Sequence, residues 1–328
     1  MMTESAQLLD AFDARAERRN LRRDFFKLAV GAAAAGATAF TLTSKAGAQA
    51  AITDTDILNF ALNLEYLEAQ FYAYAANGAG LPASQLTGTG NQGAVTGGAQ
   101  VNFATGNGDD AIIGQYAREI AADEAAHVAF LRTALGSAAV AQPAINISGD
   151  ANGPFTAAAR AAGVVGATET FNPYASPTAF LLGAYIFEDV GVTAYKGASP
   201  LISNKTFLQA AAGILAVEAY HAAIVRTTLY GLGYDMNNPQ PSLITAAGRI
   251  SDARDSLDGS TDLDQGIAQT TVNGQLVSNI VPLDNNGIAF SRTPQQVLNI
   301  VYLNNAAATL GGFFPAGVNG TLRASAAN

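Results

Sequence analysis

The chain has 328 residues, a net charge of −9, no cysteine and two histidines, His127 and His221. Without cysteine, disulfide scaffolds, Cys-ligated zinc, iron–sulfur clusters and thiol nucleophiles are excluded. With 49% hydrophobic and 13% charged residues the chain is not disordered, and its acidity argues against nucleic acid as a partner. Any chemistry that needs an imidazole must use these two histidines.

Residues 1–50 are predicted to be a cleavable export signal. A basic stretch precedes a short apolar run at 28–43, and small residues with two A-x-A sites follow. The string RRDFFK at 22–27 resembles a twin-arginine (Tat) signal, which implies the Tat export machinery as a partner and a periplasmic or extracellular protein. The apolar run is too short and too rich in Ala and Gly for a stable membrane span. The rest of the chain, from residue 49 on, has a net charge of −11.

Four long helices are predicted after the signal. The first covers 57–76, where apolar residues recur at helical spacing behind the N-cap candidates of 53–56. A loop rich in Gly, Asn and Thr at 77–108 leads to the second, which runs from about 109 to 135. An irregular link at 138–175, with a short helix around 156–162, leads to the third at 177–196. The fourth begins near Ser203 and ends before Gly231.

The four helices contain an internal repeat. The second and fourth both have the pattern Glu-Ala-x-His, with Arg five residues after the histidine and then Thr. The first and third each have a Glu with a Tyr seven residues later. One helix pair used twice predicts an all-α fold over residues 51–235. The expected architecture is a pseudo-twofold four-helix bundle with a long crossover. The paired residues are Glu124-x-x-His127 with Glu218-x-x-His221, and Glu65 and Tyr72 with Glu188 and Tyr195.

Residues 236–328 are predicted to be a mostly irregular extension packed on the bundle. Turn residues alternate with short apolar runs over 236–290, and an acidic stretch lies at 252–264. A threonine followed by a proline opens one short helix, from about Thr293 to Tyr302.

The repeated motif predicts a metal centre. Residues three apart share one helix face, so Glu-x-x-His offers a carboxylate and an imidazole to one ion. Two such pairs and one inward Glu from each other helix suit two adjacent divalent ions. The region after residue 50 has seven glutamates, so both histidines fall three residues after one by chance on the order of once in a thousand. The predicted ligands are Glu65, Glu124, His127, Glu188, Glu218 and His221.

Simpler explanations exist for each of these residues taken alone. A single histidine on an apolar helix is more often a hydrogen-bonded core residue, and a single glutamate is more often solvated. Here both explanations would have to hold repeatedly, in runs such as 61–64 and 185–187 that are too apolar for a solvent face. Because a buried unpaired carboxylate is costly, metal coordination is favoured.

The same motifs resemble the ferritin-like superfamily, in particular bacterial ferritin-like domain proteins related to desiccation-related proteins. The resemblance covers most of residues 53–315 and implies that Glu124 and Glu218 bridge two ions, with Glu65 and Glu188 terminal and one histidine on each ion. Glu68, one turn after Glu65, is either a further ligand or a surface residue. Tyr72 and Tyr195 are either catalytic residues beside the ligands or core tyrosines. The matching strings are LNLEYLEA at 62–69, DEAAH at 123–127, FEDVGVTAY at 187–195, EAYH at 218–221 and GIAFSRTP at 287–294.

Three functions follow from this resemblance. The first is an exported di-iron oxidoreductase with two Fe ions, which oxidises Fe(II) with oxygen or peroxide, or reduces peroxide. Two Mn ions that disproportionate peroxide suit the same ligands. The third is a stress- or desiccation-related protein whose metal site is structural or vestigial. A homo-oligomer is left open, although the long insertion and tail would obstruct a ferritin-type cage.

Overall fold

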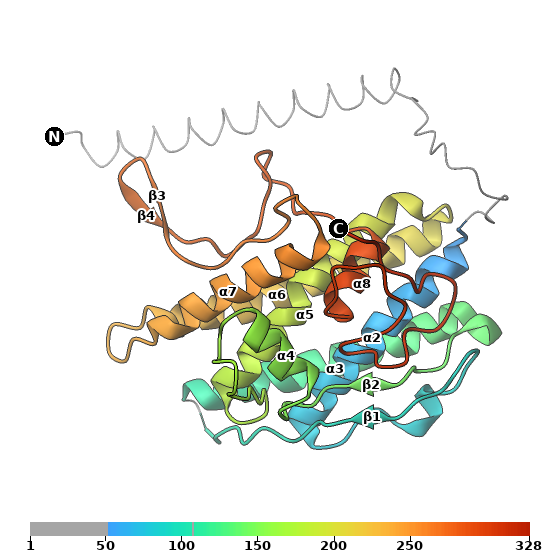
Figure 1. The fold of residues 1–328 in the computed structure, drawn as a ribbon, viewed down its shortest axis with the longest axis horizontal. Coiled ribbons are helices and arrows are strands. Elements are labelled where there is room, and N and C mark those ends of the chain that lie inside the picture. The colour runs from blue at the N-terminus through green and yellow to red at the C-terminus, as the bar shows by residue number, and fades with distance from the viewer. Residues whose placement is uncertain (1–51, 107) are drawn as a thin grey trace. The chain divides into compact units, whose positions relative to one another are not determined.

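The computed structural model describes residues 52–106 and 108–328, so the predicted export signal lies outside the described residues. Residues 52–328 form one compact unit built on four long helices, which confirms the predicted all-α bundle (Figure 1). Labels follow Figure 1. Helix α2 packs along α3, α5 packs along α6, and the two pairs meet through α2–α5 and α3–α6. The four are α2 (Asp54–Asn77), α3 (Asp109–Leu135), α5 (Pro177–Ala198) and α6 (Lys205–Gly233).

Local capping signals set the helix boundaries close to the predicted ones. Thr53 and Asp56 form a capping box at the start of α2, and Gly78 ends that helix with φ 73°. Ser176 accepts a hydrogen bond from the backbone of Ala179 just before the proline that opens α5. The Asn204 side chain caps α6 in the same way.

The insertion after α2 and the crossover after α3 lie side by side. Strand β1 (Val95–Thr96) pairs in parallel with β2 (Ile145–Asn146), so two connections far apart in sequence share backbone hydrogen bonds. The side chain of Arg132 on α3 donates to the carbonyl of Thr87 and to the Tyr66 hydroxyl, which ties the insertion to α2. The same connections hold the short helices η1 (Ala83–Gln85), η2 (Gly136–Ala138) and α4 (Pro154–Ala161).

The C-terminal extension contains more helix than the sequence predicted. Helix α7 (Pro241–Asp258) was not predicted, because its charged residues and its lack of a capping side chain hide the spacing of Leu243, Ala247 and Ile250, which are buried. It packs on α5, α6, α4 and α8 (Pro294–Val301). The remaining elements are η3 (Ser199–Leu201), β3 (Thr270–Val272) and β4 (Gln275–Val277), and the last two form an exposed antiparallel hairpin.

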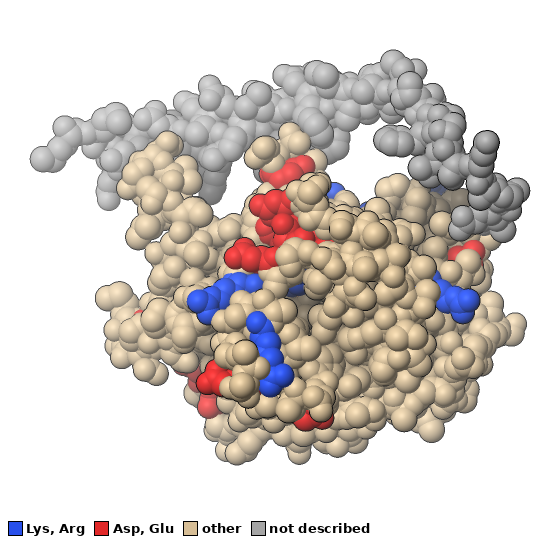
Figure 2. Space-filling view, viewed as in Figure 1, with Lys and Arg blue, Asp and Glu red and all other residues tan. Residues whose placement is uncertain are grey.

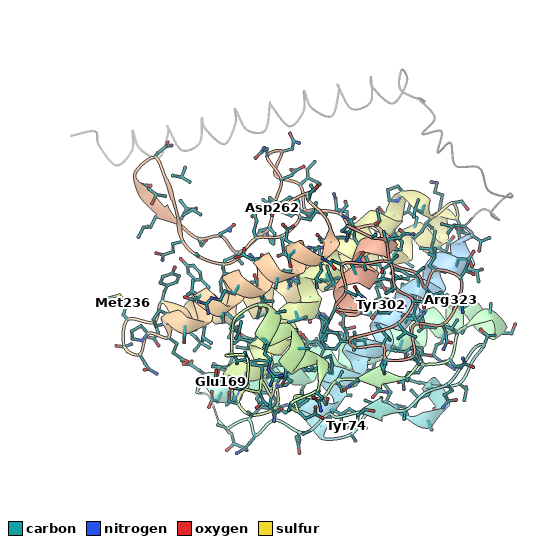
Figure 3. The ribbon with its side chains drawn as sticks, viewed as in Figure 1. Tyr74, Glu169, Met236, Asp262, Tyr302 and Arg323 are labelled. Carbon is teal, nitrogen blue, oxygen red and sulfur yellow. The ribbon has the colours of Figure 1, made fainter. Side chains whose placement is uncertain are left out.

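The segment after α8 is held to that helix through Tyr302. The Tyr302 hydroxyl donates to the carbonyl of Arg323 and accepts from the amide of Val318, and Figure 3 labels Tyr302 and Arg323 among these C-terminal loops. Phe313 and Phe314 are fully buried. The end of the chain is therefore irregular in backbone and yet part of the core.

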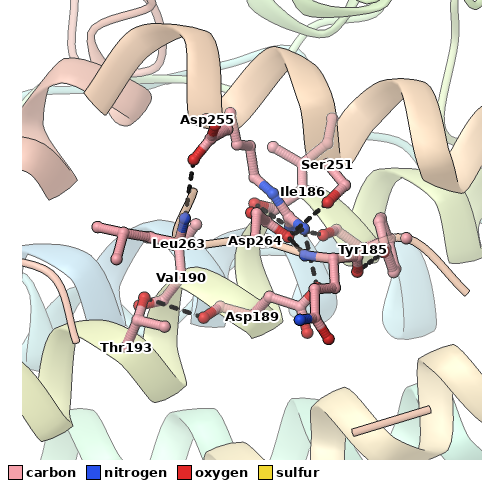
Figure 4. A network of polar contacts seen from close by, with 12 residues as sticks. Tyr185, Ile186, Asp189, Val190, Thr193, Ser251, Asp255, Leu263 and Asp264 are labelled. Atoms are coloured by element: carbon pink, nitrogen blue, oxygen red, sulfur yellow. Dashed lines mark hydrogen bonds and ion pairs between the residues drawn. The ribbon is translucent and has the colours of Figure 1, made fainter. Parts of the chain in front are cut away.

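A buried chain of ion pairs locks the extension onto the bundle (Figure 4). Asp189 on α5 pairs with Arg226 and Arg254 at 2.8 Å each, and Asp264 pairs with Arg254 at 2.6 Å. Arg292 then joins Asp264 to Asp258. Three arginines and three aspartates neutralise one another, which is the condition under which buried charges are tolerated.

Helix α6 meets the length and hydropathy criteria for crossing a membrane and is, on those criteria alone, a weak candidate among the described residues. One of its faces packs on α5, and that face carries Glu218 and His221. Only 33% of its apolar window is buried, so packing in the bundle covers one part of this helix and leaves the rest outside the core.

Candidate metal centre

The six predicted ligands meet in the interior of the bundle. Helices α2 and α5 supply one glutamate each, and α3 and α6 supply one Glu-x-x-His pair each. All six residues are buried, and the most exposed of them, His127, is only 8% exposed. The helical repeat that predicted a shared face therefore brings these residues into one cluster.

The cluster has two halves, each with one histidine. In the first, His127 Nδ1 lies 3.2 Å from Glu65 Oε2, 3.5 Å from Glu124 Oε2 and 3.6 Å from Glu218 Oε1. Ligand atoms of these four residues all lie within 4.8 Å of one another, which is close enough to surround one metal ion.

The second half is built around His221. Its Nδ1 lies 3.0 Å from Glu124 Oε1 and 3.8 Å from Glu188 Oε2. Ligand atoms of Glu188, Glu218 and His221 form a second group within 4.8 Å. Glu218 belongs to both groups, and the two oxygens of Glu124 face different histidines, so these two carboxylates lie between the halves.

Several polar atoms of the cluster make no hydrogen bonds with one another and are arranged as metal ligands would be. Both oxygens of Glu124, both of Glu218, Glu188 Oε2 and His221 Nδ1 are buried without a hydrogen-bond partner in the described part of the chain. His221 Nδ1 is close to Glu124 Oε1 but does not have hydrogen-bond geometry toward it. Because orphaned buried carboxylates are costly, a set of oxygen and imidazole donors converging in this way suits divalent cations.

Two tyrosines, one on α2 and one on α5, each donate a hydrogen bond to the cluster glutamate of the other helix. The hydroxyl of Tyr72 on α2 donates to Glu188 Oε1, and that of Tyr195 on α5 donates to Glu65 Oε1. Each tyrosine lies two turns, about 10 Å, from the glutamate on its own helix, which is too far for a hydrogen bond. Each tyrosine therefore contacts the glutamate of the other helix, and not the glutamate on its own helix with which the sequence repeat paired it.

One histidine has a supporting carboxylate. Asp123 Oδ2 lies 3.2 Å from His221 Nε2, on the side of the ring opposite the cluster. An acceptor at that nitrogen fixes the tautomer and leaves Nδ1 facing the glutamates. The Asp123 side chain is 44% exposed, so the polar edge of the centre lies between α3 and α6.

Glu68 is buried at the edge of the cluster, not at the surface. It is 6% exposed and makes no hydrogen bond to another described residue. The equivalent position in the other half of the repeat is Gly191, three residues after Glu188. A methyl group there would lie 2.2 Å from Glu218 Oε2 and 3.5 Å from Glu68 Oε1, so this glycine makes room for both carboxylates. A glycine in the third helix was present in the sequence, but nothing in the pattern distinguished it.

Comparison with known proteins agrees with this geometry. The model of the ferritin-like domain family matches residues 53–231, which is more than half of the chain. The chain belongs to the ferritin-like family. It is 28% identical over 275 residues to the ferritin-like catalase Nec2 of Nesocodon mauritianus, which covers 82% of this chain and 84% of that protein.

A second relative is named a desiccation-related protein. The desiccation-related protein PCC13-62 of Craterostigma plantagineum is 31% identical over 252 residues, covering 75% of this chain and 76% of that protein. No solved structure matches this ferritin-like chain significantly.

In the metal-free protein, crowding of carboxylates holds protons in the cluster. Burial, with the nearby charge of Glu124, raises the pKa of Glu65 to about 7, and burial raises the pKa of Glu188 to about 8. Burial alone would lower the histidine pKa values, but contacts with the carboxylates raise them to about 11 for His127 and about 9 for His221. Burial would raise the pKa of Glu124, yet both histidines outweigh it and lower that pKa to about 2.

These shifts predict opposite pH dependences with and without metal. Glu65, Glu188 and both histidines bind protons more tightly in the folded chain, so metal-free stability falls as pH rises from about 4.5 to about 11. Bound metal displaces those protons, and metal affinity therefore rises over the same range. The increase in melting temperature caused by Mn²⁺, relative to a chelator, should grow from about pH 5.5 to about pH 8 in thermal unfolding. A gain that is constant or falls with pH would contradict the prediction.

The role of Gly191 predicts a matched pair of glycine variants. Gly191→Ala places a methyl against the Glu218 carboxylate and should lower bound metal well below that of the unmodified protein, because a ligand between the two halves must move. Gly213→Ala on α6 meets no atom within 4 Å and should keep full metal content, with stability raised by about 0.5–1 kcal/mol. Elemental analysis of both purified variants decides; equal metal content would refute the role of Gly191.

Proposed function

We propose that this protein holds two redox-active metal ions in the Glu/His cluster and uses them to consume hydrogen peroxide. The single observation that carries the proposal is the convergence of buried, unpartnered carboxylate and imidazole atoms on two adjacent positions. Similarity to a protein named a ferritin-like catalase supports peroxide as the substrate. Both histidines of the chain belong to this cluster, and the chain has no cysteine for a thiol-based route.

The ligand residues would be Glu65, Glu124 and His127 on one side and Glu188 and His221 on the other, with Glu218 between. A pair of ions that changes oxidation state supplies the two-electron exchange that converts two molecules of peroxide into two of water and one of dioxygen. The carboxylates balance the charge of the ions. Glu68 would be an additional ligand or a residue that accepts a proton at the edge of the centre.

The groups around the ligands would position them and hold protons. The Tyr72 hydroxyl holds a proton at Glu188 Oε1, and the Tyr195 hydroxyl holds one at Glu65 Oε1. Burial raises the pKa of both tyrosines well above the ordinary value, so both stay protonated and keep the two glutamates oriented. Asp123 orients the His221 ring through Nε2.

The reaction that we propose depends on which metal ions are bound. Two Mn ions suit disproportionation of peroxide, whereas two Fe ions suit Fe(II) oxidation or peroxide reduction, and the donor set accommodates both. The resemblance to a desiccation-related protein supports a second candidate, a stress protein in which the metal only stabilises the fold. We further propose export by the Tat system, which rests on the basic, apolar and small-residue order of residues 1–50.

A double histidine variant tests the proposal. The purified chain from residue 51 should bind about two Mn or Fe ions and release dioxygen from hydrogen peroxide, measured by elemental analysis and an oxygen electrode. His127→Ala/His221→Ala should lose at least about tenfold in metal affinity and with it the turnover. Tyr220→Ala, next to His221 but 70% exposed, is the control and should retain both.

The assays also separate the candidates. Oxygen release with Mn supports disproportionation, and Fe(II) oxidation without oxygen release supports the di-iron alternative. Metal that raises the melting temperature without any turnover would support the structural role and refute the enzymatic one. Equal, weak metal binding by the unmodified and double-variant proteins would refute the metal centre itself.

A further inference from the structure

An apolar cavity opens at the surface between α4, α7 and the end of α8. Its volume is about 160 Å³, and its walls are almost entirely aliphatic. Ala157, Ala161 and Ser256 belong to these walls and are exposed, so the cavity is open to solvent. Figure 1 shows α4, α7 and α8 on the viewed face, and in Figure 2 the charged side chains of that face gather around the α4 and α7 region, whereas the rest of the face is mostly uncharged. We call this the outer cavity.

A second, smaller cavity lies beside the metal centre. Its volume is about 20 Å³, which is enough for roughly one water-sized molecule. Glu68 and Gly191 line one side, and Val301 and Phe313 from the C-terminal region line another. Gly191 is also the residue that lies against the Glu218 carboxylate, so this inner cavity abuts the cluster.

Two residues line both cavities. Ile186 on α5 and Ile300 on α8 belong to the walls of the outer cavity and of the inner one. Both are buried, at 5% and 2% exposure. These two side chains therefore lie between the outer cavity and the inner one.

We propose that the outer cavity, the Ile186–Ile300 constriction and the inner cavity form the entry route by which small uncharged molecules reach the metal centre. The occupant class is a small neutral oxidant, hydrogen peroxide or dioxygen; this assignment of substrate class rests on the proposed function. The C-terminal extension, through α7 and α8, thereby forms the wall that sets the size limit of the substrate.

The chemistry of the walls supports this class. An aliphatic passage with room for about one water-sized molecule excludes hydrated cations and bulky hydroperoxides, because neither can shed its water or its alkyl group there. The outer cavity also has a charged side chain in its wall. Arg254 lines the outer cavity, is 3% exposed, and its Nε is buried without a hydrogen-bond partner among the described residues. Its charge is balanced by Asp189 and Asp264, so it offers a hydrogen bond to a neutral oxygen without attracting anions.

Xenon tests the route without any catalytic assay. Crystals of the metal-loaded protein under xenon pressure should show xenon in the outer cavity, because cavities with mainly aliphatic walls bind it. Ile300→Ala should extend xenon into the inner cavity. Leu298→Ala is the matched control, since Leu298 is equally buried on α8, loses the same number of carbons and lines neither cavity.

Kinetics with two peroxides test the size limit. In Ile300→Ala, the single-turnover rate constant for oxidation of the reduced metal pair by tert-butyl hydroperoxide, which is reduced to tert-butanol and water, should rise by on the order of tenfold relative to that for hydrogen peroxide. Leu298→Ala should leave this ratio unchanged. Oxygen uptake by the Fe(II)-loaded protein, faster in Ile300→Ala than in Leu298→Ala, would identify dioxygen as an occupant as well.

The outcomes separate the route from the proposed function. Absence of xenon from the inner cavity of Ile300→Ala, or equal effects of the two substitutions on the peroxide ratio, would overturn the route even in an active protein. Xenon along the whole path in a protein that turns over neither peroxide nor oxygen would support the route and refute the proposed function.

Discussion

The structure depends on one electrostatic constraint: five glutamates are buried together in the interior of the bundle. Desolvation and mutual repulsion raise the pKa values of Glu65, Glu68, Glu188 and Glu218, so the cluster cannot be fully ionised without compensating positive charge. The two histidines provide part of it, and Tyr72 and Tyr195 stabilise two of the oxygens. The remaining orphaned atoms are those that we propose bind metal.

The pseudo-twofold repeat explains how a single chain builds this cluster. The two halves differ at several positions around the ligands, and these differences distinguish the surroundings of the two histidines. Glu68 in one half is matched by Gly191 in the other, and the position equivalent to Asp123, which supports His221, is Val217. The repeated arginines also diverge. Arg132 anchors the insertion after α2, whereas Arg226 joins the buried ion pairs that hold the C-terminal extension. The two halves of the centre therefore have different surroundings, and the inner cavity lies on the side of Glu68.

Helical periodicity and capping residues were sufficient to predict the four bundle helices, although α3 begins without a capping side chain and α6 continues to Gly233, past its predicted end before Gly231. The residues of the cluster could be named because both histidines share one offset from a glutamate. Contacts between helices were not predictable: the tyrosines exchange partners across α2 and α5, and Gly191 matters only because Glu218 lies against it. Helix α7 was missed because its inward face includes Arg254, a charged residue that is buried only because Asp189 and Asp264 neutralise it.

The extension beyond residue 235 gives the bundle a covered side. It buries α5, closes the inner cavity with Val301 and Phe313, and leaves an aliphatic opening at the surface. The polar edge at Asp123, between α3 and α6, is a different side of the centre. This separation would let ions and small neutral oxidants approach by different paths.

The most direct test of the central claim is anomalous X-ray diffraction from crystals of the chain loaded with manganese or iron. The account predicts two anomalous peaks within coordination distance of the six ligands, with Glu124 and Glu218 between them, and about 3.5–4 Å apart as in other two-metal sites. A single peak, or metal bound only outside the cluster, would contradict it.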